Sequence, residues 1–247
     1  MKNSENHNAD IAISIVVAIY NMESRLSDCL NSLLNQTLPN IEIICVDDGS
    51  SDNSPVILRE FAHCSEKLKI ITFPENRGVS QTRKAGVEYS RGKYVIFVDA
   101  DDELEIDACE NMYGAMIADP VEILHVGTTV VNSGNCSKEE IAACEQCVRP
   151  YNGKLYGEEI LKSALIKREF PYTLWGKLFD STLCRRAFRE IEDGFFCMAE
   201  DLYVFSILAF YAKSYRGIPD LFAYRYSYGV GISTCKTLTL ERFTAVR

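Results

Sequence analysis

The chain has 247 residues, which is enough for one large domain or two small ones with a sizeable core. Hydrophobic residues make up 47% and charged residues 25%, and the mean hydropathy is -0.07, so a disordered, collagen-like or coiled-coil protein is excluded. The formal charge of -9 repels nucleic-acid phosphates over most of the surface. We therefore expect no nucleic-acid partner.

The ten cysteines are the unusual feature of this composition. Residues 1–10 are polar and lack the apolar centre of a secretion signal, so we expect reduced thiols in a cytoplasmic protein rather than a disulfide framework. Cys144 and Cys147 have metal-like spacing, but a lone pair does not predict a zinc site. The longest apolar stretches are shorter than the roughly 20 residues of a membrane span. The sequence is compatible with peripheral contact at the inner face of the membrane.

The first half of the chain alternates predicted strands with predicted helices. After a tail (1–10) that we expect to be disordered, the β-branched run at 11–19 is typical of a strand buried on both faces. Apolar spacing and cap residues then predict, in order, a helix around 26–34, a strand at 41–46, a helix from 54, a strand at 69–73, a helix at 79–90 and a strand at 94–98. Short connections between these elements predict an α/β fold with a mainly parallel, Rossmann-like sheet flanked by helices.

The second half is less regular. We expect a helix at 106–118, an extended segment at 121–131, a polar loop or insertion at 132–152, helices at 157–167 and 202–211, and a last extended segment at 221–226. No repeat or low-complexity linker separates the halves, which favours one two-part domain. Because the chain ends without a turn or cap, we expect it to be cut short at its carboxyl end.

Polar clusters follow all four strands predicted in the first half. Ligands of open parallel sheets bind beyond the carboxyl ends of the strands, where helix N-termini and loop amides converge. The clusters are Tyr20 with Asn21, Asp47 with Asp48, the segment 76–78, and the acidic group Asp99, Asp101 and Asp102. Four such clusters at one edge predict a binding site there.

The acidic group is the first candidate for metal binding. Three carboxylates within four residues repel one another, and a divalent cation with hard oxygen ligands, Mn²⁺ or Mg²⁺, relieves that repulsion. Such ions complete their shell with substrate phosphates, so the cluster predicts a ligand that carries a diphosphate. A solvated acidic turn, with Asp102 capping a helix, is the alternative.

The other clusters suit the rest of a nucleotide. Asp47 or Asp48 could accept a hydrogen bond from a base on which Tyr20 stacks, although Asp-Asp-Gly-Ser is also ordinary turn chemistry. Arg77 and Arg83 lie near the start of the next helix, where cations meet phosphate oxygens, although each alone is more typical of a surface charge.

Five segments stand in a characteristic order and spacing. They are Ser14–Asn21, Ile44–Asp52, Asn76–Arg83, Gly92–Asp102 and Ala199–Asp201. Together they resemble the family-2 type of nucleotide-sugar glycosyltransferases, which have the GT-A fold. The resemblance implies that residues 11–126 bind the nucleotide sugar and that residues 127–247 carry the acceptor side and the catalytic base.

The resemblance also implies residue roles. Tyr20 and Asp48 would contact the base, Asp99 or Asp101 the ribose, and Asp101 or Asp102 the metal within a DxD-type motif. Asp201 matches the catalytic base, although Glu200 and Asp201 could simply complement a helix N-terminus. Trp175 is a candidate platform for the acceptor sugar and is equally suited to the core. Gly176 stands where such sequences commonly carry asparagine.

The implied enzyme is a metal-dependent, inverting transferase of the hexosyltransferase type. It would move one sugar from a nucleoside-diphosphate sugar, with UDP as the favoured nucleotide, to a hydroxyl of a glycan or lipid-linked acceptor in surface polysaccharide synthesis. A sugar nucleotidyltransferase would need a glycine-rich, basic loop after the first strand. Residues 18–22, which follow that strand, are neither glycine-rich nor basic. A phosphoacceptor signalling domain is about half this length, which disfavours that class. An inactive module that binds a nucleotide sugar on the same fold remains an alternative to the enzyme.

Overall fold

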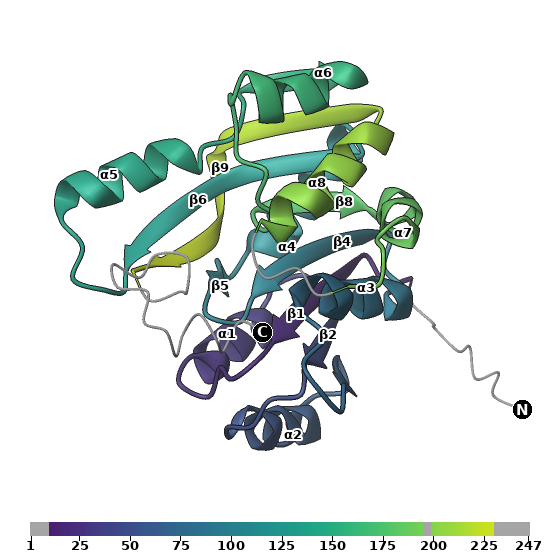
Figure 1. The fold of residues 1–247 in the computed structure, drawn as a ribbon, viewed down its shortest axis with the longest axis vertical. Helices are drawn as coiled ribbons and strands as arrows, with labels where there is room; N and C mark the ends of the chain where they lie inside the picture. Colours follow the sequence, from purple (N-terminus) through teal and green to yellow (C-terminus); the bar gives the residue numbers. More distant parts are fainter. Residues whose placement is uncertain (1–9, 195–198, 230–247) are drawn as a thin grey trace, which may run out of the picture.

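The computed structural model describes residues 10–194 and 199–229 (Figure 1). Almost all of the tail expected to be disordered, and the end of the chain expected to be cut short, lie outside the described residues. The strands are β1 (Ile13–Ile19), β2 (Ile41–Asp47), β3 (Leu68–Thr72), β4 (Tyr94–Asp99), β5 (Glu103–Leu104), β6 (Ile123–Asn132), β7 (Gly153–Tyr156), β8 (Lys177–Asp180) and β9 (Ser214–Tyr228). The helices are α1 (Leu26–Leu34), α2 (Ser54–Cys64), α3 (Val79–Tyr89), α4 (Ala108–Ala118), α5 (Lys138–Cys147), α6 (Glu158–Leu161), α7 (Ser181–Arg189) and α8 (Glu200–Tyr211), with a π-helical turn η1 (Lys162–Ile166) after α6.

The strands of the described residues form one sheet in the order β3-β2-β1-β4-β8-β6-β9-β5, with β7 paired to β9. β3, β2, β1 and β4 are mutually parallel, and β6 is parallel to β9. β8 runs antiparallel between β4 and β6. The predicted α/β fold, with a mainly parallel sheet flanked by helices, is confirmed. Its parallel register brings the ends of β1, β2 and β4 to one edge.

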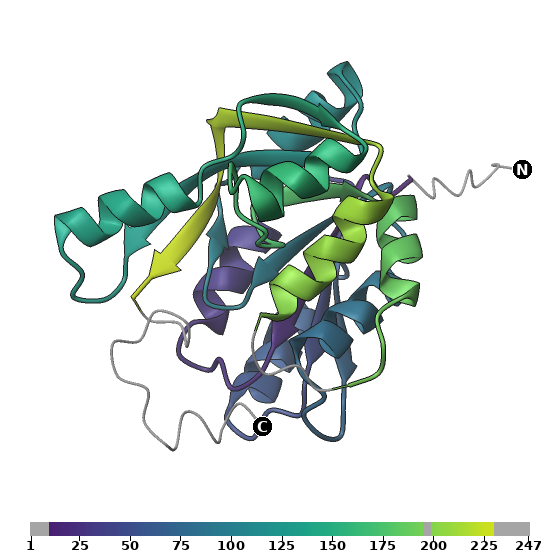
Figure 2. The ribbon, with the colours of Figure 1, turned by 45° about the horizontal axis from the view of Figure 1, so that its top comes forward.

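Helices cover both faces of the sheet, as Figures 1 and 2 show. Alternate residues of β1 and β4 face opposite layers, because successive side chains of a strand point to opposite sides. Ile15 and Ile96 pack with α1, α2 and α4, whereas Val16 and Phe97 pack with α3, α7 and α8. The continuous apolar runs in the sequence reflect this two-sided burial.

The amino-terminal edge of the sheet holds one buried carboxylate that is fully paired. Glu42 accepts hydrogen bonds from the Ser14 hydroxyl at 2.7 Å, from Lys69 at 2.9 Å and from both the backbone and the guanidinium of Arg91. Burial raises the pKa of Glu42, but these donors outweigh it and hold the pKa below its usual value. The charge at this edge is therefore neutralised within the fold.

The prediction of a loop at 132–152 is wrong, because α5 lies within it beside β6 (Figure 1). None of the α5 residues is fully buried, and only Ile141 and Cys144 pack partly against the core, so the helix offers just a short apolar pattern for periodicity to detect. Its sequence signal is a capping box, in which Ser137 and Glu140 bond each other's backbone N–H.

The sequence also missed β7, β8 and α7, and β9 begins seven residues before the expected extended segment at 221–226. β7 and β8 have four residues each, which is too short for a periodic pattern to be read. No helix among the described residues is both long enough and apolar enough to cross a membrane.

Candidate functional site

The loops after β1 and β2 are tied together at the carboxyl edge of the sheet. Asn21, whose φ is 53°, accepts a hydrogen bond from the Ser51 backbone N–H at 2.8 Å through its side-chain oxygen. The Met22 N–H donates to the hydroxyl of Ser54, the first residue of α2, at 2.8 Å. Tyr20 is half-buried at the base of this junction. The two predicted polar clusters therefore form one continuous rim.

A cavity of about 480 Å³ opens beside this rim. It is lined by Asp47, Gly49, Ser50, Pro55, Leu58, Arg59, Ile70, Thr72, Phe73 and Pro74. Asp47 accepts a hydrogen bond from the Ser50 N–H at 3.1 Å, and the Arg77 guanidinium lies 4.8 Å from the centre of the Phe73 ring. An aromatic wall, a proline and a carboxylate are the groups that a planar heterocycle needs.

Asp48 lies beneath the loop that leads into α3. Its two carboxylate oxygens accept hydrogen bonds from the backbone N–H groups of Arg77, at 2.7 Å, and Gly78, at 2.9 Å. Gly78 has φ 87°, a conformation that glycine adopts without a Cβ clash. Asp48 thus shapes the start of α3, and its predicted contact with a base stays a prediction.

Arg83 joins two of the predicted site carboxylates, although they are far apart in the sequence. Its guanidinium bonds Asp99 at 2.8 Å and Asp201 at 2.6 Å, and the Arg83 side chain is only 4% exposed. Burial alone would lower the pKa of Arg83, but Asp201 and Asp99 outweigh it and raise the pKa, so the guanidinium stays charged. Both of its arms are engaged by carboxylates. Its predicted contact with a phosphate stays a prediction.

Asp201 is also held from its other side. Its second oxygen accepts a hydrogen bond from the Leu174 backbone N–H at 3.3 Å, and its side chain remains 18% exposed. Glu200 and Asp201 open α8, where the partial positive charge of a helix N-terminus favours carboxylates. Ala199, just before them, has φ 59°, which is strained for a residue with a Cβ. Asp201 is therefore oriented and within reach of solvent.

Asp101 and Asp102 follow Asp99 but differ in their surroundings. Asp102 is buried, and its oxygens accept hydrogen bonds from the Tyr224 hydroxyl and the Ser227 N–H, each at 2.7 Å. Burial, with the charges of Asp99 and Asp101, raises the pKa of Asp102 to about 8. Burial, with the charge of Asp99, raises that of Asp101 to about 6. Uncompensated carboxylate repulsion of this kind is what a divalent cation relieves.

Among the described residues, no group of three or more His, Cys, Asp or Glu side chains is arranged to hold a metal ion by itself. The described residues of the acidic group would therefore offer an ion one or two carboxylates, and further ligands would come from outside this group. Magnesium sites that use substrate phosphates have this composition. The residues fit such an ion, with Asp101 the less buried of the two predicted ligands.

Trp175 lies against the core side of this edge. It is 6% exposed and stacks on Tyr224, at 5.1 Å between ring centres, and on Tyr226, at 4.8 Å. Its contact with an acceptor sugar stays a prediction. The next residue, Gly176, has φ 69°, a left-handed conformation that asparagine also tolerates. The departure from the family's common asparagine is thus conformationally conservative.

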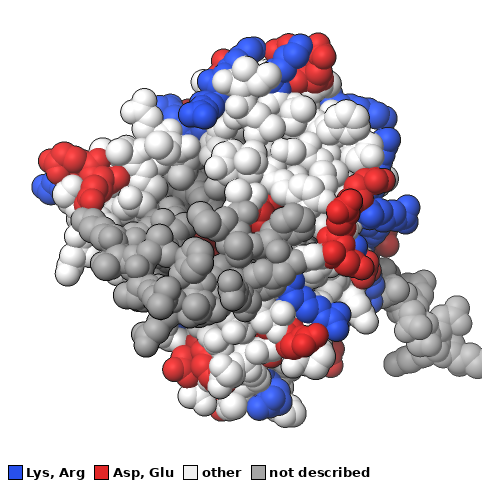
Figure 3. Space-filling model, viewed as in Figure 1, with Lys and Arg blue, Asp and Glu red and all other residues white. Residues whose placement is uncertain are grey.

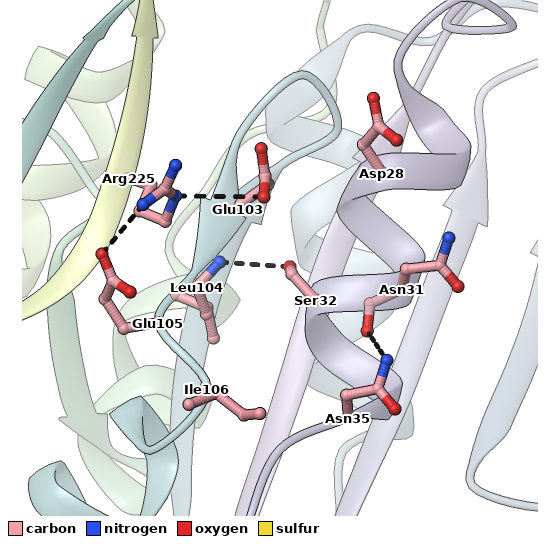
Figure 4. Close-up of a pocket in the computed structure, with 9 residues that line it drawn as sticks. All are labelled: Asp28, Asn31, Ser32, Asn35, Glu103, Leu104, Glu105, Ile106 and Arg225. Carbon is pink, nitrogen blue, oxygen red and sulfur yellow. Dashed lines mark hydrogen bonds and ion pairs between the residues drawn. The ribbon is translucent and has the colours of Figure 1, made fainter.

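A second cavity, of about 500 Å³, lies between α1 and β5 (Figure 4). The Arg225 side chain lies between Glu103 and Glu105 and pairs with both, while Asp28, Asn31 and Asn35 line the opposite wall on α1. The Leu104 N–H donates to the Ser32 hydroxyl at 3.1 Å and ties the two walls together. No predicted site residue lines this cavity.

The structure thus gathers the predicted residues along one edge and adds three that the sequence did not identify. Leu174 acts through a backbone N–H, Tyr224 links the Asp99 backbone to the Asp102 carboxylate, and Lys177 is buried behind the segment that holds Asp201. A backbone donor leaves no side-chain signal in a sequence. Lys177 begins β8, the short strand that the sequence missed.

The fold, with its edge of carboxylates, is the GT-A type fold of glycosyltransferases. Residues 14–190 match the family described as "Glycosyl transferase family 2", and the chain belongs to that family. It is 30% identical over 226 residues to glycosyltransferase GlyA of Streptococcus pneumoniae, which covers 87% of this chain and 31% of GlyA. It is 40% identical over 104 residues to a poly(ribitol-phosphate) beta-glucosyltransferase of Bacillus spizizenii, which covers 41% of this chain and 16% of the relative.

The solved structures agree on the fold. TarS of Staphylococcus aureus, residues 1–349 in complex with UDP-GlcNAc, superposes with a TM-score of 0.72 at 22% identity, covering 95% of this chain and 64% of TarS. At that identity the likeness shows the fold alone. The chain spans about a third or less of the length of the two relatives named above.

Proposed function

We propose that this chain transfers a single sugar from a nucleoside-diphosphate sugar, with UDP as the nucleotide, to a hydroxyl of an acceptor, and that the sugar's anomeric configuration inverts. The observation that carries the proposal is the arrangement of Asp201, with one oxygen on Arg83 and the other on the Leu174 N–H. Arg83 also bonds Asp99, so its guanidinium links the proposed base to one of the carboxylates proposed to bind the sugar donor.

The donor would occupy the rim formed by the ends of β1, β2 and β4. Its base would enter the cavity beside Asp47, near Tyr20 and the Phe73–Arg77 pair, with Asp48 holding the loop in shape. Its ribose and diphosphate would lie toward Asp99 and Asp101. The UDP-GlcNAc complex of the structural neighbour TarS supports a UDP-sugar as the donor class.

We place a Mn²⁺ or Mg²⁺ ion at Asp101, with Asp102 as the second candidate ligand. When bound, such an ion neutralises charge that develops on the leaving diphosphate. Asp99 would then remain with Arg83, and Asp101 would gain a positive charge that offsets the burial and the Asp99 charge that raise its pKa. The ion therefore complements residues that the fold leaves electrostatically strained.

The proposed reaction is a direct displacement at the anomeric carbon. Asp201 accepts the proton of the acceptor hydroxyl as that oxygen bonds to the anomeric carbon and the bond to the diphosphate breaks. Arg83 keeps one oxygen of Asp201 fixed while the other accepts a single backbone donor. One displacement inverts the configuration.

The acceptor is proposed to be a glycan or lipid-linked glycan of surface polysaccharide synthesis. The poly(ribitol-phosphate) beta-glucosyltransferase among the relatives supports a polyhydroxylated acceptor. Glu200 and the segment around Trp175 flank Asp201, which supports the proposal that they contact the acceptor. An inactive binding module on the same fold would bind donor without transferring its sugar.

Asp201→Asn tests the proposal. General-base catalysis contributes about 100-fold or more to rate, so kcat for sugar transfer should fall by at least that factor. UDP affinity, measured by calorimetry with Mn²⁺ present, should be unchanged because Asp201 does not face the proposed nucleotide cavity. The matched control is Asp193→Asn, an exposed carboxylate that pairs with Lys84 and should leave kcat unaltered. Wild-type rates in Asp201→Asn would refute the assignment of the base.

A further inference from the structure

Lys177 is fully buried, at 0% exposure, as the first residue of β8. A buried ammonium is costly unless it is paired, so such a residue needs an account of what it contacts. β8 lies between β4 and β6, and the ammonium lies between this central part of the sheet and α8, so the charge is not at a surface. None of the roles proposed above uses it.

The contacts of Lys177 lead to Asp201 through one short segment. Its Nζ donates to the Thr173 carbonyl at 2.6 Å and lies 3.3 Å from the Thr173 hydroxyl. The peptide after Thr173 carries the Leu174 N–H that donates to Asp201. Lys177 therefore anchors, from behind, the backbone that holds the second oxygen of Asp201.

A second contact connects Lys177 to the helix that carries the base. Its ammonium lies 5.4 Å from the centre of the Phe205 ring, on α8 one turn after Asp201. A cation over an aromatic face is attracted by the ring's quadrupole. One side chain thus touches both the segment that orients Asp201 and the helix on which Asp201 stands.

The charged and titratable neighbours make this contact sensitive to Asp201. Burial lowers the pKa of Lys177 to about 7, and the charge of Asp201 opposes that shift. On β6, His125 pairs in register with Lys177, and burial together with the charge of Lys177 lowers its pKa well below its usual value, so it is neutral. Its ring bonds the Tyr215 hydroxyl at 2.9 Å. Asp201 is therefore the anion that favours a charged Lys177.

We propose that Lys177 is a positioning residue for Asp201, which fixes Thr173 so that the Leu174 N–H keeps the base aimed at the acceptor hydroxyl. The inference rests on the proposed function, because it assigns Lys177 a part in the same proton transfer. Small displacements of a catalytic group cost rate far more than they cost binding. Lys177 should therefore act on kcat and leave the donor subsite untouched.

A purely structural role makes a different prediction. A role in stability alone predicts a lower Tm with an unchanged kcat in the folded variant. Lys177→Met keeps the unbranched shape of the side chain but leaves the Thr173 carbonyl without its donor, so Tm should fall somewhat, and kcat of the folded protein separates the two roles. Lys177→Gln keeps an N–H donor for the Thr173 carbonyl without the charge and should restore part of the lost rate.

The experiment compares Lys177→Met and Lys177→Gln with a matched buried control, Tyr215→Phe. Tyr215 lies in the same core and loses its hydroxyl bonds, including the one to His125, in that variant, so it reports on the loss of a buried polar group that does not contact the Thr173–Leu174 segment. The measurements are kcat, donor KM, UDP affinity by calorimetry and Tm. We expect kcat to fall about tenfold or more in Lys177→Met, less in Lys177→Gln and not in Tyr215→Phe, with UDP affinity equal in all four proteins.

The outcomes separate this inference from the proposed function. If the wild type transfers sugar, Asp201→Asn does not, and Lys177→Met keeps kcat within about twofold of the wild type, only the role of Lys177 is overturned. A fall of kcat in Tyr215→Phe equal to that in Lys177→Met would overturn it too. If Lys177→Met does not fold, Lys177→Gln decides on the same readout. A wild type that transfers no sugar overturns the proposed function instead.

Discussion

Arg83 gives the clearest physical account of how single residues build this site. Its guanidinium neutralises two carboxylates that would otherwise repel each other across α3, β4 and α8. Because the guanidinium is planar and forked, each arm fixes one carboxylate in direction as well as in distance. Lysine, a single point charge, could not hold both in the same way.

Arg83→Met should therefore be severely destabilising. Removing one partner of a buried ion pair leaves uncompensated charge, and the expected loss in the free energy of unfolding is about 3 kcal/mol or more. Arg91→Met is the matched control, since that side chain is 59% exposed and Glu42 retains Lys69; its loss should be about 1 kcal/mol or less. Urea denaturation measures both. Equal losses would contradict a buried clamp at Arg83.

At the scale of elements, α3 shows how closely a helix must approach the sheet to place Arg83. A Cβ added to Gly86 would lie 2.3 Å from a methyl group of Val16, so the helix rests almost directly on β1. This close approach brings Arg83, one turn earlier, to the end of β4. Gly114 in α4 has nothing within 4 Å of a built Cβ and marks no such contact.

The two glycines form a matched pair for measurement. Gly86→Ala should cost about 1–3 kcal/mol of unfolding free energy, because the core at Val16 is already filled. Gly114→Ala should gain up to about 1 kcal/mol from helix propensity. Opposite signs in urea denaturation are expected. If Gly86→Ala were as stable as the wild type, the spacing of α3 and β1 would be wrong.

Secondary structure was predictable wherever burial leaves a periodic pattern. β1 and β4, apolar on both faces, were found from their runs of branched and aromatic residues, and α1 from its leucines. α5 was missed because only Ile141 and Cys144 pack partly against the core, and β8 because four residues show no period. The missed β8 carries Lys177, so a gap in the element prediction became a gap in the site.

At the scale of the whole molecule, the acidic side chains behind the net charge of -9 are unevenly paired with basic groups. On the face shown in Figure 3, the described acidic and basic side chains are interspersed rather than gathered into one field. At the edges of the sheet the contrast is sharper, since Glu42 is fully paired while Asp101 and Asp102 have raised pKa values. The proposed cation would offset this part of the negative charge and allow an anionic ligand to bind there.

Ligand binding should accordingly stabilise the whole fold. A ligand present at 100 times its Kd adds about 2.7 kcal/mol to the free energy of unfolding. For a chain of this size that corresponds to a rise in Tm of roughly 5 °C or more. We expect the rise with UDP and Mn²⁺ together, a smaller one with either alone, and loss of the Mn²⁺-dependent part in Asp101→Asn. If no nucleoside diphosphate raised Tm with any divalent ion, the donor proposal would fail.

The sequence alone was sufficient for the fold class and for the edge of the sheet at which polar residues gather. Periodicity, turn residues and the parallel order of strands are carried by neighbouring residues, so they can be read locally. The partners of those residues were decided only by the tertiary structure. Arg83 meets Asp99 and Asp201 across separations of 16 and 118 residues, and Lys177 is buried behind the backbone that holds Asp201. Such pairings depend on how helices and strands pack, and no local pattern records that.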